Sequence, residues 1–263
     1  MWNTTKTVIV CTAVIACISF SFINNQQSDS SLTSVDIGTI KAGTTTVLND
    51  GKGIKLQGYG SMFGMHNASD QGRFAYKKLK GDFDITIQVE NISTSLESFA
   101  EGGLMVRKDL DPKSLMVANF VTNNNYKGES DQYTFMFRLI EGGSIEPYDQ
   151  IIENFYGDHT FGTPSFGYSA RGWSKTNLPA RPFPYVWLRL IRQGNKYVGY
   201  RRFGSKEDWG KWEKMSEITA DLGEDPYVGI ALSANHHTLT TPNTKGNPES
   251  MSEITISKII GLQ

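Results

Sequence analysis

The chain has 263 residues, of which 38% are hydrophobic, so it is long and apolar enough to bury a sizeable core. Its 26 basic and 27 acidic residues leave a net charge of -1. This balance excludes a protein that binds nucleic acid or an anionic membrane through its overall charge, so any basic patch must be local.

The N-terminal segment has the layout of a secretory signal. A short polar start that carries Lys6 precedes an apolar run over residues 7–23, which is too short to span a membrane comfortably as a helix. We therefore exclude residues 1–23 from the fold. The expected location is outside the cytoplasm of a bacterium: secreted, periplasmic or lipid-anchored at the cell envelope.

Three fates of this segment stay open. It is cleaved at the small residues around Ser19 and Ser21, it is lipidated at Cys17, or it stays as an uncleaved anchor. The residues before Cys17 resemble a bacterial lipobox, but the sequence after it remains apolar where a lipoprotein usually turns polar. Both cysteines, Cys11 and Cys17, lie in this segment, so the exported part has no disulfide to stabilise it.

The rest of the chain is predicted to be one β-rich domain. Residues 24–34 are polar and typical of a flexible leader, which places the domain at residues 35–263. Within it, short runs alternate between apolar and polar side chains, and no comparable stretch has the 3.6-residue period of a helix. The predicted strands cover residues 44–48, 54–57, 73–79, 83–92, 104–107, 115–121, 132–140, 185–192, 196–203, 211–218, 227–234 and 253–260.

Residues 141–184 interrupt this alternation. Glycines and prolines recur through the segment, and aromatic residues such as Trp173 are interspersed. A stretch of this length without regular structure is unusual in a compact domain, and its aromatic content argues against disorder. We interpret it as an ordered insertion that folds over the sheet edge and serves function. The alternative is that its aromatic side chains only cap the core.

The clearest local structure is a hairpin in residues 185–203. Two β-rich runs flank Gly194 and Asn195, and residues that tolerate a positive φ are needed to close so tight a turn. A two-residue loop here pairs Trp187 with Arg202, Leu188 with Arg201, Arg189 with Tyr200, Leu190 with Gly199, Ile191 with Val198 and Arg192 with Tyr197. One face of the hairpin is then mostly aliphatic. The other is the first candidate for a binding face, and it carries Trp187, Arg189, Tyr200 and Arg202.

Five segments resemble the successive strands of a concanavalin A-like jelly-roll family. They are residues 81–85 (GDFDI), 102–107 (GGLMVR), 187–195 (WLRLIRQGN), 204–209 with a turn before Trp209, and 227–232 (YVGIAL). The family is known as the regulation-of-enolase or domain-of-unknown-function type, and it is similar to C-terminal domains of some β-xylosidases. The resemblance implies an all-β fold, an antiparallel two-sheet β-sandwich.

The family does not decide the function. Its jelly rolls occur as carbohydrate-binding appendages, as glycan-active domains and as uncharacterised proteins. The resemblance begins near residue 81 and extends to the C-terminus, but residues 141–184 depart from the shorter family pattern. No family site can therefore be transferred to that insertion.

The residue types favour an exported glycan-binding or accessory protein for extracellular polysaccharide. Flat aromatic rings stack on the apolar face of a sugar, and planar cations form paired hydrogen bonds with hydroxyls or carboxylates. Each tryptophan taken singly is equally consistent with a core residue, and the co-location with two arginines favours binding. The predicted ligand-binding residues are Trp187, Arg189, Tyr200, Arg202, Trp209, Trp173 and His236.

The main alternative is a polysaccharide-degrading enzyme. A lyase would use Tyr200, Arg189 and Arg202, with His236 or His237 arriving from the loop after residue 234. A glycoside hydrolase would need paired carboxylates, for which Glu101, Glu129 and Asp131 are the candidates, although the E-x-D-x-x-E pattern of related laminarinases lacks its third acid here. A third alternative is a cell-envelope structural protein without a sugar site.

No metal or other cofactor is predicted. His236 and His237 are adjacent, so their side chains project to opposite sides of an extended chain and cannot easily bind one ion. Structural calcium stays open, because carboxylate and carbonyl oxygens suit it, but no EF-hand-like loop identifies its ligands. The oligomeric state is not indicated by the sequence.

Overall fold

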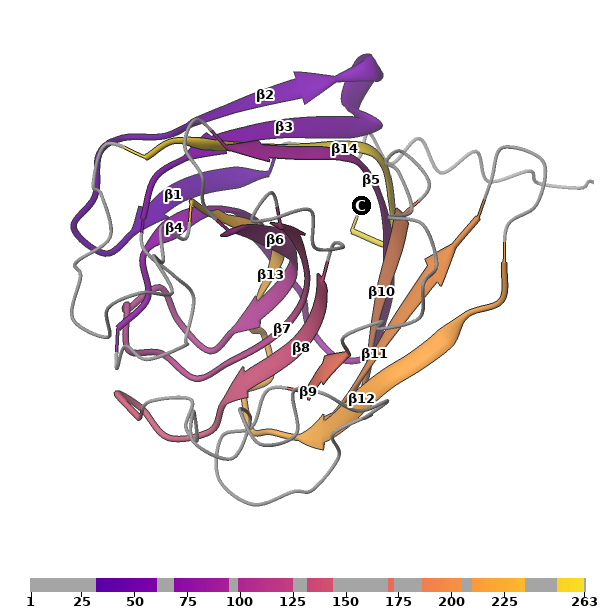
Figure 1. Cartoon of the computed structure of the whole chain (residues 1–263). Coiled ribbons are helices and arrows are strands. Elements are labelled where there is room, and N and C mark those ends of the chain that lie inside the picture. The colour runs from indigo at the N-terminus through magenta and orange to yellow at the C-terminus, as the bar shows by residue number, and fades with distance from the viewer. Residues whose placement is uncertain are drawn as a thin grey trace, which may run out of the picture.

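The computed structural model describes residues 32–60, 69–94, 99–124, 132–143, 170–172, 186–204, 210–234 and 250–262. These residues form two seven-stranded antiparallel sheets packed face to face (Figure 1). Among them, the only helical element is the short 3-10 turn Asn49–Gly51. No helix in the described part of the chain has the length and apolar character needed to cross a membrane.

Sheet A is built from strands of both the N-terminal and the C-terminal half of the chain. In spatial order they are β1 (Thr33–Ile37), β4 (Gly72–Lys78), β13 (Tyr227–Ser233), β6 (Phe99–Arg107), β7 (Met116–Asn124), β8 (Gln132–Arg138) and β9 (Ala170–Gly172). Strands β6, β7 and β8 follow one another as a meander. Strand β13 inserts between β4 and β6, so residues more than 100 positions apart become neighbours.

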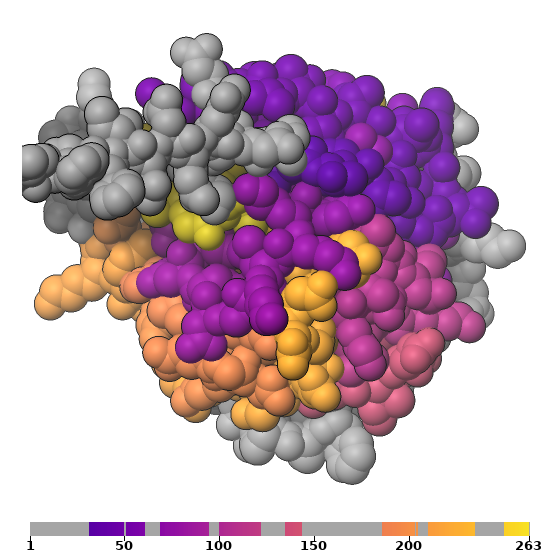
Figure 2. Space-filling view, turned by 180° about the vertical axis from the view of Figure 1, so that it is seen from behind, coloured from indigo at the N-terminus to yellow at the C-terminus, as the bar shows by residue number. Residues whose placement is uncertain are grey.

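Sheet B covers sheet A. Its order is β12 (Glu213–Thr219), β11 (Lys196–Phe203), β10 (Val186–Gln193), β5 (Phe83–Thr94), β14 (Ser252–Ile260), β3 (Gly53–Gly58) and β2 (Thr44–Leu48). Figure 1 shows it running over the top and down the right side of the molecule. Strand β14 lies between β5 and β3, and Figure 2 shows this C-terminal segment in yellow against the purple of the N-terminal half.

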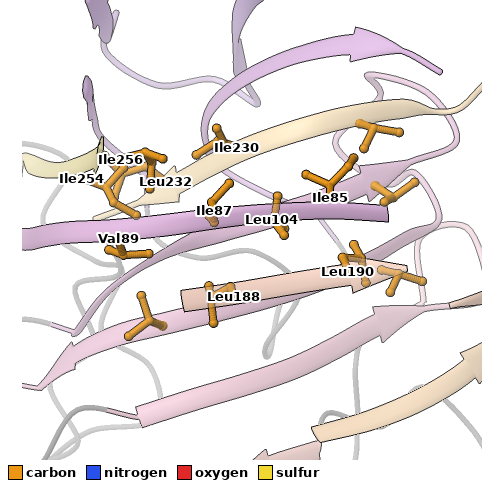
Figure 3. Packing of buried hydrophobic residues seen from close by; sticks show 14 of the residues in the cluster. Ile85, Ile87, Val89, Leu104, Leu188, Leu190, Ile230, Leu232, Ile254 and Ile256 are labelled. Carbon is orange, nitrogen blue, oxygen red and sulfur yellow. The ribbon is translucent and has the colours of Figure 1, made fainter. Parts of the chain in front are cut away.

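The main core lies between the two sheets. On β5 the side chains of Ile85, Ile87 and Val89 are fully buried, while Asp84 before them and Thr86 between the two isoleucines are not. Figure 3 shows these isoleucines beside Leu104 of β6 and Leu188 and Leu190 of β10. The period-2 pattern predicts this arrangement, in which one face of each strand is buried and the other is exposed to solvent.

The predicted antiparallel two-sheet sandwich is confirmed, and the chain passes repeatedly between the sheets as in a jelly roll. Every predicted strand is present, with ends that differ by a few residues. Two strands were not predicted. Strand β1 begins at Thr33, within the segment expected to be leader, and β9 lies within residues 141–184 and pairs with the edge of β8. Strand β1 starts in the polar stretch that was assigned to the leader, and β9 has only three residues, too few to show alternation.

The predicted hairpin register is also confirmed. Strands β10 and β11 pair Trp187 with Arg202, Leu188 with Arg201 and Arg189 with Tyr200, as a two-residue turn requires. Gly194 in that turn has φ of 60°, a value that glycine adopts without strain. The turn therefore sets the faces of both strands.

Asn119 of β7 ties this hairpin to sheet A. Its side chain is fully buried, and its amide nitrogen donates hydrogen bonds of 3.0 Å to the backbone carbonyls of both Arg189 and Tyr200. Buried backbone carbonyls need such partners, because an unpaired one costs about 1–3 kcal/mol. The contact fixes β10 and β11 against the opposite sheet.

The far face of sheet A carries a second apolar cluster that ends in a buried ion network. The cluster includes Phe74, Phe120 and Met136. At its end, Asp70 accepts hydrogen bonds from Arg107 at 2.5 Å and from Arg138 at 2.6 and 2.9 Å, and all three side chains are at most 1% exposed. Both guanidinium groups also donate to loop carbonyls, so the network closes the loops that follow β6 and β8.

Candidate functional site

The candidate site lies on the outer face of sheet B, on the side of β10 and β11 that points away from the core. Leu188 and Leu190 point into the core and are fully buried, so Trp187 and Arg189, which alternate with them, point outward. Tyr200 and Arg202 project from β11 on the same side, directly across from them. The structure therefore brings together the four residues that the hairpin pattern placed on one face.

These side chains form an alternating row of cations and aromatic rings. The guanidinium of Arg202 lies 5.0 Å from the ring centre of Trp187 and 4.7 Å from that of Trp212. Arg189 lies 5.8 Å from the rings of both Trp212 and Tyr200. The row, called the cation–π row below, consists of Lys258, Trp187, Arg202, Trp212, Arg189 and Tyr200. Each such contact is worth about 0.5–2 kcal/mol, depending on how far it is desolvated.

Arg189 is held at one end of the row by an acid. Asp84 of β5 accepts hydrogen bonds from its Nε at 2.7 Å and also from its Nη2. This hydrogen bonding raises the pKa of Arg189 above its usual value, against the opposing effect of partial burial. The paired geometry fixes the plane of the guanidinium.

Arg202 lies in the middle of the row and is partly buried. Partial burial lowers the pKa of its guanidinium, which nevertheless stays charged because the arginine pKa is so high. Its guanidinium contacts two indole rings, those of Trp187 and Trp212. The result is a charge held in place at a partly exposed surface.

Exposure differs along the row. The side chain of Trp187 is only 5% exposed, whereas Arg189, Tyr200, Arg202 and Trp212 are half-buried. Lys258 is exposed, and its Nζ lies 5.8 Å from the Trp187 ring centre. Trp187 therefore forms the floor of the surface, and the cations and the other rings form its accessible part.

The remaining predicted site residues lie outside the described residues. These are Trp173, Trp209 and His236, together with the alternative candidates His237, Glu129 and Asp131. Glu101 is described: it is 3% exposed in β6, opposite Ser233 of β13 and on the other sheet from the cation–π row. The described residues contain no group of three His, Cys, Asp or Glu side chains that could hold a metal ion.

Sequence reasoning missed Lys258 and Trp212. Lys258 enters the row because β14 and β10 both pair with β5, one on each side, which places Lys258 two strands away from Trp187. No local pattern signals that pairing. Trp212 immediately precedes β12, and its place within the strand predicted over residues 211–218 was the available clue.

Two other arginines of the hairpin make contacts that stabilise the fold. Arg192 donates to the carbonyls of Gly194 at 2.7 Å and Gly223 at 2.6 Å, and it lies over the ring of Tyr197. Arg201 forms an ion pair with Glu213 of β12. Neither belongs to the cation–π row.

No family model matches this chain, and no curated protein matches its sequence. A functionally unknown protein from Saccharomyces cerevisiae has a similar structure, with a TM-score of 0.51 at 12% identity over 88% of this chain and 97% of that one. A legume lectin-like domain from Entamoeba histolytica gives 0.39 at 9% identity, over 87% and 97%. A xylan β-1,4-xylosidase from Bacillus halodurans C-125 gives 0.36 at 10%, over 78% and 32%. At these identities a likeness shows the fold alone.

Proposed function

We propose that this chain is an exported glycan-binding protein that recognises extracellular polysaccharide through the outer face of sheet B. The observation that supports it is the cation–π row, in which three aromatic rings and three cations share one sheet face. A sheet face that met only water would not need the aromatic rings for solubility. Export by the N-terminal segment and membership of the regulation-of-enolase type of jelly roll are part of this proposal.

The geometry suits a sugar polymer. Tyr200 and Trp212 are half-exposed rings on which a pyranose can stack, and the guanidinium groups of Arg189 and Arg202 lie beside them to donate hydrogen bonds to ring substituents. Contacts with one another and with Asp84 already restrain these side chains, so less side-chain entropy is lost on binding. An extended surface also suits a chain of repeating units better than a single small molecule.

Affinity electrophoresis against a panel of neutral and acidic polysaccharides tests the proposal. At least one polysaccharide should retard the protein, and Trp212→Ala should weaken that retardation. Tyr59→Ala is the matched control, because Tyr59 also stacks with a lysine, Lys41 at 5.0 Å, but follows β3 outside the row. Both variants should keep the wild-type thermal transition within a few degrees.

Retardation by none of the polysaccharides would overturn the proposal. Equal weakening by Trp212→Ala and Tyr59→Ala would place the binding site elsewhere. Release of reducing ends, or absorbance from an unsaturated uronate, would instead identify a polysaccharide-degrading enzyme.

A further inference from the structure

The strand registers arrange the outer face of sheet B into lines that run across the strands. One line contains Lys258, Gln88, Trp187 and Arg202, on β14, β5, β10 and β11 in turn. The next contains Ile260, Thr86, Arg189, Tyr200 and Lys214. The third contains Asp84, Ile191, Val198 and Glu217. Charge is therefore distributed unevenly across this face.

Four cations on these lines stand against two carboxylates, and both carboxylates are engaged. Asp84 binds Arg189, and Glu217 binds Lys214 at 2.6 Å and also Lys196 at 2.9 Å. Both acids lie on the third line, and the first line itself contains no carboxylate. The first line is thus a positive strip on a chain whose net charge is -1.

The two cations of this line flank one ring. Lys258 reaches Trp187 from β14, and Arg202 reaches it from β11 on the opposite side of β10. The Trp187 ring is only 5% exposed, so it offers a neutral sugar almost no ring surface to stack on. An anionic sugar instead meets two charges held at a fixed spacing.

We infer that the glycan bound by this surface is anionic, a polysaccharide bearing carboxylate or sulfate groups, and that Lys258 and Arg202 are the residues that recognise its charge. This inference rests on the proposed function. It assigns Trp187 to positioning the two cations and leaves stacking to Tyr200 and Trp212. Arg189 contributes less charge, because Asp84 already neutralises it.

Pairs of polysaccharides that differ in charge test the inference. The purified protein is titrated calorimetrically with polygalacturonate and its methyl-esterified form, and with dextran sulfate and dextran. Binding should be at least about tenfold tighter to the charged member of a pair, as expected when two ionic contacts are lost. It should also weaken as salt is raised. The two pairs distinguish a carboxylated from a sulfated ligand.

Variants locate the effect. Lys258→Gln and Arg202→Gln should each weaken binding of the charged polymer by about fivefold, the effect of one partly exposed ionic contact. Arg202→Lys keeps the charge and should restore much of the affinity, which separates charge recognition from loss of folding. Lys55→Gln is the control, because Lys55 lies on the same face but is paired with Glu253 at 2.9 Å.

The outcomes separate the two proposals. Equal affinity for the charged and uncharged members of both pairs would overturn the charge inference and leave glycan binding intact. If the protein binds none of the four polymers and no polysaccharide of a wider panel, both proposals are overturned. An equal loss in Lys55→Gln would show general electrostatic attraction and would also overturn the assignment to Lys258 and Arg202.

Discussion

Asp84 of β5 holds the guanidinium of Arg189 of β10 through both of its carboxylate oxygens. The two side chains are 48% and 30% exposed, so the pair lies on the surface, where such contacts contribute at most about 1 kcal/mol to stability. Its effect is mainly local: it orients Arg189 beside Trp212 and Tyr200 and cancels its charge.

Replacing Asp84 with Asn should raise affinity for an anionic polysaccharide by about two- to fivefold, because it removes a competing negative charge from the cation–π row. The free energy of unfolding should change by less than about 1 kcal/mol. Calorimetric titration and a urea melt measure the two effects. A loss of affinity in Asp84→Asn would show that the orientation of Arg189 matters more than its free charge.

Replacing Asp70 with Asn should destabilise the protein strongly. The change leaves Arg107 and Arg138 buried without their shared carboxylate, and breaking a buried ion network costs about 3–5 kcal/mol. The control is Asp225→Asn, since Asp225 is 59% exposed in its pair with Lys78 and its replacement should leave the urea midpoint almost unchanged. Similar urea midpoints for the two variants would contradict the prediction.

Replacing Gly199 with Ala should destabilise the sandwich by about 1–3 kcal/mol through overpacking. A Cβ at this position would lie 2.3 Å from Cδ2 of Phe135, whose ring packs across the core onto β11. Gly194→Asn is the control, because nothing lies within 4 Å of a Cβ there and Asn tolerates its φ of 60°. Thermal melts should show a lower midpoint for Gly199→Ala than for Gly194→Asn.

Tyr197 should make the protein sensitive to alkali. Burial raises the pKa of Tyr197 from 10.0 to about 12. Between these values the unfolded chain loses the phenol proton while the folded chain keeps it, so stability falls as pH rises, by at most about 1.4 kcal/mol per pH unit. Below pH 10 the proton is bound in both states and the effect vanishes.

Tyr197→Phe lacks this proton and should lose less stability over the same window. Urea melts of both proteins between pH 9 and pH 12 measure the difference, which should be small at pH 9 because Phe fills nearly the same space. Parallel loss of stability in the two proteins would assign the alkaline sensitivity to other groups.

Local pattern was sufficient for the fold class and for one face of the site. Alternation with period 2 identified the strands, and the two-residue turn at Gly194 and Asn195 set the register of β10 and β11. That register alone places Trp187, Arg189, Tyr200 and Arg202 on one side. These features follow from sequence because they depend only on one turn and the two strands that it joins.

Tertiary structure decided what those side chains touch. Lys258, Trp212 and Asp84 come to the hairpin face from β14, from the segment before β12 and from β5, through pairings between distant strands. Alternation specifies which side of a strand a residue faces, but not which strand lies beside it. Burial of the whole core decides which strands are neighbours. The contacts of Arg202 and Lys258 with the Trp187 ring, and the Asp70 network between distant loops, therefore form only when the sheets are assembled.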